Sequence, residues 1–451
     1  MAARPSRRLL ALFVLLALAP ASWAGAPAAK VYVILWFDTE DYLLPADDDA
    51  ALHLADFLTN EGIRATFKVV GEKARTLERR KRDDVERVFG KAPTCYGQPG
   101  SSWGPQSYGA MRKWGMGVYL DAGRHFGLDG KPCYYGGVLN LYNLDHILRA
   151  ELTDPRGEPK AEDRFADARK ALLAEGGGVV SIFYHPCEFV HKEFWDAVNF
   201  KAGANPPREQ WKVPPQKSSE ETRAAYETFE TWVRFIKRFP DVQFVTASEA
   251  AKLYRDRARG RRFTPDEIKA VAEGVGDDIG FQKYKDYTLS ASEVFALLND
   301  YVAERAAGRT PDGLEVMETP FGPTGASPAA GEGVATDWSQ FGRTAADVAD
   351  FLRKQGRVPG TVWLGSKPVA PEAYLRSLAV VARDLLDGKA PPDTVEVRPA
   401  RLKAADYVSA DDPKLWGWII FPPGFRAPAM MELAKRQAWT LKPALLDPDE
   451  P

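Results

Sequence analysis

Two short segments, far apart in the chain, carry side chains suited to acid–base or metal chemistry. Residues 37–41 (FDTED) place three carboxylates directly after an apolar run, and residues 183–186 (FYHP) place a histidine after another. Crowded carboxylates bind metals or divide acid and base roles, and a histidine exchanges protons near neutral pH. Asp38, Glu40 and His185 are therefore candidate site residues. The alternatives are a solvated loop for the acids and a backbone-bonded histidine at a strand end.

Both segments follow stretches with the pattern of buried β-strands. Residues 31–37 (VYVILWF) are a continuous apolar run of strand length, and residues 178–184 are a second strand candidate. Apolar residues within 51–58 fall on one helical face, and residues 64–70 (RATFKVV) have the pattern of another strand. Strand, helix and strand in succession form a βαβ unit, which predicts a parallel sheet or barrel with its chemistry at the carboxyl ends of the strands.

The rest of the chain divides into two parts. We predict an α/β fold, with a distorted (β/α) barrel over residues 25–260 and a mainly helical domain over residues 261–451. In the second part, residues 293–316 and 372–397 resemble each other, because both have the pattern of a helix, a Gly-x-x-Pro turn and a short strand. They are either copies of one unit or unrelated amphipathic helices. Further strands are expected at 94–97, 117–120, 134–142 and 242–245, and helices at 160–175 and 219–238.

Composition excludes some functions and the N-terminus predicts a destination. The 451 residues contain 60 Lys and Arg against 62 Asp and Glu, a formal charge of −2, which argues against a nucleic-acid partner. Basic residues precede an apolar stretch, and small residues end at Ala24, as in a cleaved signal peptide over residues 1–24. We expect export to the periplasm or the extracellular space, with no transmembrane span in the mature chain. The alternative is an uncleaved N-terminal anchor.

Three cysteines, Cys95, Cys133 and Cys187, allow one disulfide and one leftover thiol in an exported protein. No Cys-x-x-Cys pair is present, so a thiolate zinc site is not expected.

The motifs together resemble the NodB-type polysaccharide deacetylases, carbohydrate esterase family 4. That family opens with a Phe-Asp-x-Asp/Glu strand end, followed by Ala-Thr-Phe-Phe-Val-x-Gly, which residues 65–71 (ATFKVVG) match. Residues 97–103 (GQPGSSW) are similar to its Arg-x-Pro-Gly motif and residues 119–121 (YLD) to the strand that supplies an acid. Residues 183–186 are similar to its late Leu-x-His motif. The resemblance spans about residues 31–250 and keeps the family's order.

The resemblance implies a metal-dependent hydrolase that removes acetyl groups from N-acetylated sugars of a glycan or cell-wall polysaccharide. A divalent metal (zinc, cobalt or nickel) would polarise the carbonyl and activate a water. By this resemblance Asp38 is the base, His185 the general acid, Asp121 a supporting acid and Glu40 a metal ligand. The substrate would meet the aromatic wall of Trp103, with Gln98, Pro99 and Tyr119 beside it.

The chain departs from the family in two places. The His-x-x-x-His metal motif is absent, since no histidine lies between His53 and His125. We infer that a strand and its flanking helix are missing there, in evolution or in the gene model. The candidates to replace the lost metal ligands, if the barrel places them nearby, are His185, His125 and His191. Gln98 stands where the family has the arginine that organises the base, which predicts an Asp38 without a charged partner.

Two other functions stay open. One is a catalytically inactive carbohydrate- or cell-wall-binding protein on the same barrel, in line with a resemblance of the C-terminal region to pseudomurein-binding repeats. The other is a glycoside hydrolase with a carboxylate pair drawn from Asp38, Glu40, Asp121 and Glu188.

Overall fold

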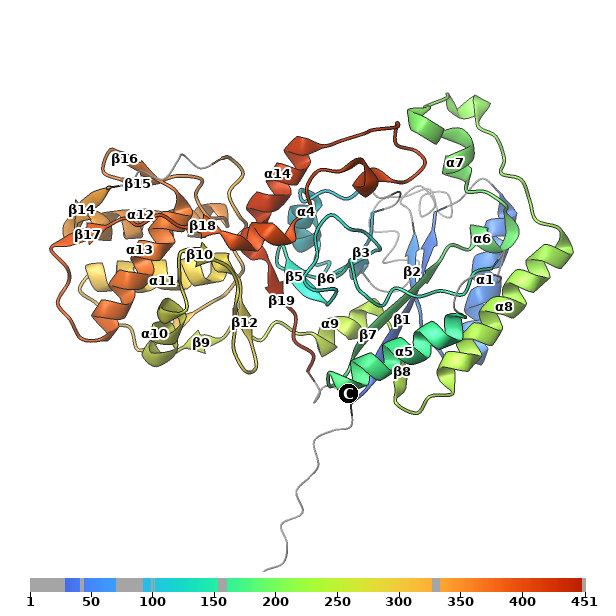
Figure 1. The fold of residues 1–451 in the computed structure, drawn as a ribbon, viewed down its shortest axis with the longest axis horizontal. Coiled ribbons are helices and arrows are strands. Elements are labelled where there is room, and N and C mark those ends of the chain that lie inside the picture. The colour runs from blue at the N-terminus through green and yellow to red at the C-terminus, as the bar shows by residue number, and fades with distance from the viewer. Residues whose placement is uncertain are drawn as a thin grey trace, which may run out of the picture.

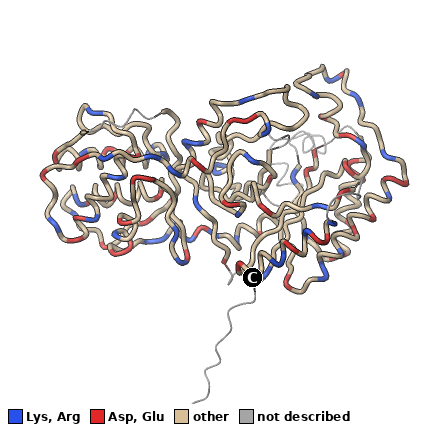
Figure 2. The backbone as a smooth tube through the Cα atoms, viewed as in Figure 1, with Lys and Arg blue, Asp and Glu red and all other residues tan. Residues whose placement is uncertain are grey.

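The computed structural model has two lobes joined by the C-terminal segment (Figure 1). Basic residues (Lys and Arg) and acidic residues (Asp and Glu) are interspersed along the backbone of both lobes (Figure 2). In the part of the chain that is described, no helix has both the length and the apolar character to cross a membrane. The predicted signal peptide lies outside that part, as does most of the region of the missing strand unit. The described residues are 29–40, 44–69, 92–98, 100, 102–152, 160–326 and 333–447.

The first lobe is built around strand β1 (Val31–Thr39), which confirms the strand expected at 31–37. Strand β7 (Gly178–Tyr184) runs parallel along one edge of β1. Its other edge is shared by β8 (Val242–Val245) at the amino half and β2 (Thr66–Val69) at the carboxyl half. All three neighbours are parallel to β1, as the βαβ pattern predicts. The carboxyl ends of β1, β2 and β7 therefore meet at one edge, where Asp38 lies.

Side chains alternate across β1 and serve two different cores. Val31, Val33, Leu35 and Phe37 pack against the helices on one face, while Tyr32, Ile34 and Trp36 pack against a second sheet on the other. Burying each such side chain contributes ~1.5–3 kcal/mol, which explains why the run is apolar throughout. The helices on the first face are α1 (Pro45–Asn60), α5 (Ala161–Ala174) and α8 (Ser219–Lys237), and α9 (Ala247–Leu253) lies with the second core.

The second sheet has the order β19-β5-β6-β4-β3 and mixes parallel with antiparallel pairs. Gly136 and Gly137, both with positive φ, form the two-residue turn between β5 and β6. Two strands separate Cys95 on β3 from Cys133 on β5, about 14 Å at ordinary strand spacing, which is beyond disulfide reach. Cys95 and Cys133 are both free thiols. The strands are β3 (Cys95–Tyr96), β4 (Val118–Leu120), β5 (Cys133–Tyr135), β6 (Val138–Leu141) and β19 (Lys442–Pro443).

The prediction of a barrel is wrong for the described residues, which form two packed sheets and no closed ring. A barrel needs hydrogen bonding from strand to strand all the way round. Here β5 and β19 run antiparallel at one edge of the second sheet, β3 has only two residues at the other, and neither edge pairs with the first sheet. The coarser prediction of a mixed α/β fold is confirmed.

The second lobe contains two units with the same order of elements. In each, a first and a last strand pair antiparallel, and they enclose a helix, a hairpin and a second helix. The segments 293–316 and 372–397 are the second halves of these units. Unit one is β9 (Arg262–Phe263), α10 (Pro265–Glu273), β11 (Gln282–Lys283), β12 (Thr288–Leu289), α11 (Ala291–Ala306) and β13 (Leu314–Glu315). Unit two is β14 (Ala335–Asp337), α12 (Trp338–Gln355), β15 (Val362–Leu364), β16 (Lys367–Val369), α13 (Pro371–Leu386) and β17 (Thr394–Glu396).

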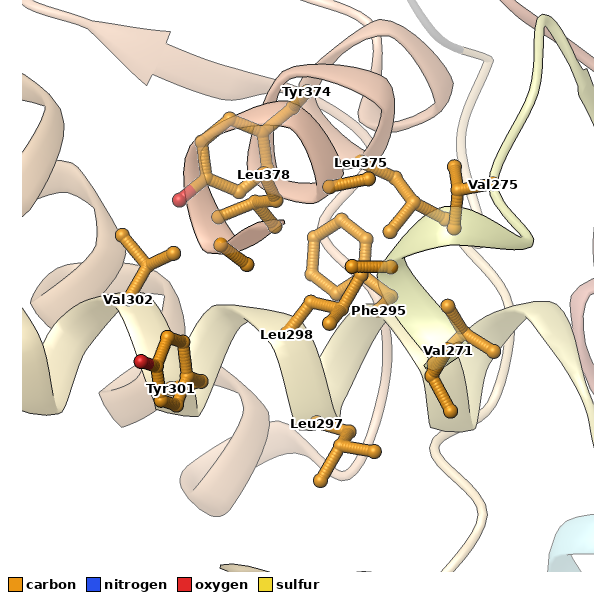
Figure 3. Close-up of a cluster of buried hydrophobic side chains, with 14 of the residues drawn as sticks. Val271, Val275, Phe295, Leu297, Leu298, Tyr301, Val302, Tyr374, Leu375 and Leu378 are labelled. Atoms are coloured by element: carbon orange, nitrogen blue, oxygen red, sulfur yellow. The ribbon is translucent and has the colours of Figure 1, made fainter. Parts of the chain in front are cut away.

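The two units share one core (Figure 3). Helix α10 packs against α13 and α11 packs against α12, so each helix of one unit contacts a helix of the other. Phe295 and Leu298 of α11 face Tyr374 and Leu378 of α13 (Figure 3). Strand β10 (Asp278–Ile279) pairs with β18 (Arg401–Leu402) beside them.

The C-terminal segment leaves the second lobe and returns to the first. Trp416, Met431 and Leu441 are buried in the same cluster as Trp103 and Tyr135, and β19 joins the second sheet. The last part of the chain thus packs on the first lobe, although the predicted second domain includes it. The domain boundary at residue 261 stays a prediction. The remaining helices are α4 (Ser107–Lys113), α6 (Cys187–Val190), α7 (Trp195–Asn199) and α14 (Pro428–Gln437).

Candidate functional site

Three predicted residues meet at the carboxyl ends of β1 and β7. Phe37 and Tyr184 are partners in the parallel pairing, so Asp38 and His185 follow side by side. His185 Nε2 lies 3.7 Å from Asp38 Oδ2 and 3.3 Å from Glu40 Oε1. The side chains are 12–17 % exposed, so their charges interact with little screening by water. The structure thus brings together the acids and the histidine that the sequence singled out.

Lys68 is the residue that the sequence analysis missed. It is the β2 partner of Asp38 in the sheet register, and its Nζ lies 2.8 Å from Asp38 Oδ1. It also donates to the Leu120 carbonyl at 3.0 Å. The prediction that Asp38 lacks a charged partner is therefore wrong. Its cationic partner comes from β2, although position 98 carries the uncharged Gln98. The available signal was a lysine in the segment ATFKVVG, where the family motif has its second phenylalanine.

Asp121 follows β4 and stabilises the neighbouring loop. Its carboxylate accepts backbone N–H groups of Gln98 at 2.9 Å and Ala122 at 2.7 Å. Burial raises the pKa of Asp121 to about 6, although the Lys68 cation and the two N–H groups oppose the rise. Gln98 thus contributes its backbone to this contact, and the supporting role that the resemblance implied for Asp121 stays a prediction.

A second ion pair lies behind His185 and also escaped the sequence analysis. Arg149 donates to both oxygens of Glu188, at 3.2 Å and 2.9 Å, and Glu188 Oε1 lies 3.5 Å from His185 Nδ1. Burial alone would raise the pKa of Glu188, but His185 and Arg149 lower it to about 2. Burial alone would lower the pKa of His185, but Glu188, Glu40 and Asp38 raise it to about 10. His185 is therefore a cation at neutral pH.

We expect Arg149→Lys to lower the free energy of unfolding by about 1–2 kcal/mol. Lysine cannot reproduce the paired hydrogen bonds to Glu188, nor the packing of the guanidinium over the Tyr184 ring. Urea unfolding of both proteins measures the loss. The control is Arg64→Lys, since Arg64 is 75 % exposed in its pair with Glu249 and should change stability by less than about 0.5 kcal/mol. Equal losses in the two variants would contradict a specific role for the Arg149–Glu188 pair.

No protein-family model matches this chain, and neither does any curated protein. Among solved structures, it is similar to a provisionally named polysaccharide deacetylase from Mycobacterium smegmatis, at 14 % identity and a TM-score of 0.30. That match covers 52 % of this chain and 92 % of the other. A 4-alpha-glucanotransferase from Thermococcus litoralis matches at 11 % identity and a TM-score of 0.29, covering 55 % of this chain and 46 % of its own. Both likenesses are distant.

Two predicted site residues, His125 and Trp103, lie in an aromatic core. His125 is 1 % exposed, stacks on Trp103 at 5.2 Å between ring centroids, and bonds through Nδ1 to the Tyr142 hydroxyl. Burial lowers its pKa to about 4, so it is a neutral core histidine. Its ring contacts and hydrogen bond are with Trp103, Tyr142 and Trp416 in this core. The prediction that His125 joins Glu40 and His185 as a metal ligand is therefore wrong.

The predicted sugar wall is also buried. Trp103 is 1 % exposed and Tyr119 is fully buried, and both pack against Tyr108. A sugar cannot reach either ring, so their predicted roles as substrate contacts are corrected. The Gly/Ser/Pro-rich loop indicated an exposed tryptophan, but the returning C-terminal segment covers it. Pro99 lies outside the described residues.

Phe194 and Trp418 form the aromatic surface nearest to His185. The Phe194 ring packs edge-on against His185 at 4.8 Å, and Trp418 packs against Phe194 at 5.2 Å. Trp418 Nε1 donates to Asp196, which holds the indole in place. Two backbone bonds, Ala202 N to Ile419 O and Gly203 N to Ile420 O, fasten the C-terminal segment here. A pocket of about 190 Å³ adjoins this surface and is lined by Arg149, Glu188 and Phe194 among others.

The described residues do not fit the predicted metal. They contain no group of three or more His, Cys, Asp or Glu side chains arranged to hold a metal ion, whereas a catalytic zinc takes three protein ligands. One oxygen of Asp38 is engaged by Lys68. No step below is assigned to a metal.

Proposed function

We propose that this protein hydrolyses acetamide groups of an N-acetylated glycan, with Asp38 as general base and His185 as general acid. The observation that carries the proposal is the approach of these two side chains to 3.7 Å at the ends of adjacent parallel strands. Asp38 offers a carboxylate that can accept a proton, and His185 offers a ring N–H that can donate one. The proposal includes export, on the strength of the predicted signal peptide over residues 1–24.

The chemistry needs two proton transfers. Asp38 accepts a proton from the attacking water as its oxygen bonds to the carbonyl carbon. Lys68 and His185 supply positive charge near the developing oxyanion. His185 then donates its proton to the sugar nitrogen as the C–N bond breaks, and Glu188 behind it stabilises the cationic form beforehand. The products are acetate and a free amino sugar, and proton exchange with water restores Asp38 and His185.

The test measures acetate and binding on the same samples. The purified full chain is incubated with oligomers of N-acetylglucosamine, acetate and free amine are quantified, and calorimetry measures binding. Acetate release in step with free amine supports the proposal. New reducing ends without acetate would indicate a glycoside hydrolase instead.

A second candidate is a glycan-binding protein without turnover. The engagement of Asp38 by Lys68 favours it, because a base already bonded to a cation is less available to water. Binding of the oligomers without acetate release would support this function over hydrolysis. If the chain neither binds the oligomers nor releases acetate, both proposed functions are contradicted.

We further propose that Trp418 stacks on a sugar ring of the bound glycan. Trp418→Ala should weaken binding of the oligomers about threefold to tenfold, the range expected for a lost aromatic contact. The control is Trp363→Ala, because Trp363 is 58 % exposed on β15 of the other lobe and should leave binding unchanged. Equal effects of the two substitutions would rule out a specific contact at Trp418.

A further inference from the structure

Lys68 is enclosed by groups that suit a cation. Its side chain is 10 % exposed. The ammonium contacts Asp38 at 2.8 Å and the Leu120 carbonyl at 3.0 Å, and it lies 4.0 Å from the centroid of the Trp36 ring. Asp121 adds a further electrostatic attraction. A carboxylate, a carbonyl oxygen and an aromatic face are all groups that attract positive charge.

Three neighbouring segments are shaped to hold this ammonium. The β1–β2 register sets Lys68 opposite Asp38, and Trp36 is held by a hydrogen bond from Nε1 to Ser181 Oγ at 2.9 Å. Gly97 leaves the room that the lysine needs, because a Cβ there would collide with both Lys68 Nζ and the Leu120 carbonyl. The position of the Lys68 side chain therefore depends on a glycine at residue 97. A solvent-exposed lysine would not need a glycine beside it.

We infer that the Lys68 ammonium is the resident cation of this carboxylate site and that the site holds no divalent metal. A tethered ammonium cannot dissociate, and a metal approaching Asp38 would have to displace it or accept a like charge beside it. Lysine thus supplies the positive charge that a divalent ion supplies in metal hydrolases. This inference concerns which cation occupies the site. Its test does not depend on whether the chain releases acetate.

The first measurement uses the tag-free full chain. After dialysis against zinc, cobalt or nickel and removal of free ion, bound metal is determined by elemental analysis for the wild type and for Asp38→Asn. We expect well below one metal per chain in both, and a thermal midpoint that does not change when a chelator is added. One retained metal per chain that Asp38→Asn loses would overturn the inference, whatever the acetate assay gives.

The second measurement removes the lysine. Lys68→Met keeps the length of the side chain and leaves Asp38 and Asp121 without their cation, so zinc or cobalt in excess should raise its thermal midpoint, although two carboxylates without a third ligand should not retain the ion through dialysis. Adding Asp38→Asn should abolish that gain. Lys131→Met, at a 60 % exposed lysine, is the control and should gain nothing. A folded Lys68→Met chain with no metal response would overturn the inference; if the variant does not fold, the wild-type measurement decides alone.

Discussion

Asp38→Asn is expected to lower the rate of acetate release about 10²–10⁴-fold, the usual contribution of a general base. The amide has the shape of the carboxylate but cannot accept the proton of the attacking water. Its oxygen can still accept a hydrogen bond from Lys68, so the enclosure of the lysine should persist. We therefore expect the rate constant to fall while the affinity for the oligomers changes little.

The matched control for Asp38→Asn is Asp49→Asn. Asp49 is exposed on α1, and its substitution should leave the rate unchanged. Circular dichroism and thermal unfolding establish that both variants are folded. Undiminished acetate release by a folded Asp38→Asn chain would remove Asp38 as the base and with it the proposed mechanism. Loss of glycan binding together with the rate would assign Asp38 to substrate binding instead.

Lys442→Met is expected to lower the free energy of unfolding by about 3–5 kcal/mol, as for other broken buried ion pairs. Lys442 on β19 is fully buried, and its Nζ lies 2.7 Å from Asp256 and 2.9 Å from both oxygens of Glu293. Burial alone would lower the pKa of Lys442, but the two carboxylates raise it. Without the lysine, two carboxylates remain buried without their cation.

This triad joins three parts of the chain. Asp256 follows α9 of the first lobe, Glu293 lies in the first turn of α11 in the second, and Lys442 belongs to the returning C-terminal segment. Glu293 also accepts from the Ser290 backbone and the Thr319 hydroxyl. Breaking the triad should therefore loosen the contact between the lobes as well as the sheet.

Urea unfolding of Lys442→Met and Lys435→Met measures the effect. Lys435 pairs with Glu432 on the surface of α14, and its loss should cost less than about 0.5 kcal/mol. The double variant Lys442→Met/Glu293→Gln should recover part of the loss, because it removes one uncompensated charge. A loss in Lys442→Met no larger than in the surface control would show that the triad does not contribute to stability.

Local pattern was sufficient for much of the secondary structure. The apolar runs at 31–37 and 178–184 became β1 and β7, because strands covered on both faces must be apolar throughout. Helix α8 spans 219–237, close to the predicted 219–238. Its capping box of Ser218 and Glu221 explains where it begins. These features depend on residues close in sequence.

The site could be predicted only in part, because some of its contacts join residues that are distant in the sequence. The sequence places Asp38 and His185 after strands, and parallel pairing brings such ends together. No pattern of neighbouring residues indicates that Lys68 bonds to Asp38, because the two meet only through the register of β1 and β2. The pairing of Arg149 with Glu188 is equally hidden, because the two residues are distant in the sequence. A lysine in a strand is equally typical of a solvent-facing position.

The sequence by itself therefore determined the strands and helices around β1, the acids and the histidine at the strand ends, and the similarity of residues 293–316 and 372–397, each with a helix, a turn and a short strand. Only the tertiary structure decided that the sheets stay open, that Trp103 and His125 are buried under the C-terminal segment, and that Trp418 lies near His185 instead. It also decided that Lys68 balances the charge of Asp38. Burial and charge pairing are sums over residues distant in the chain, and no local pattern records them.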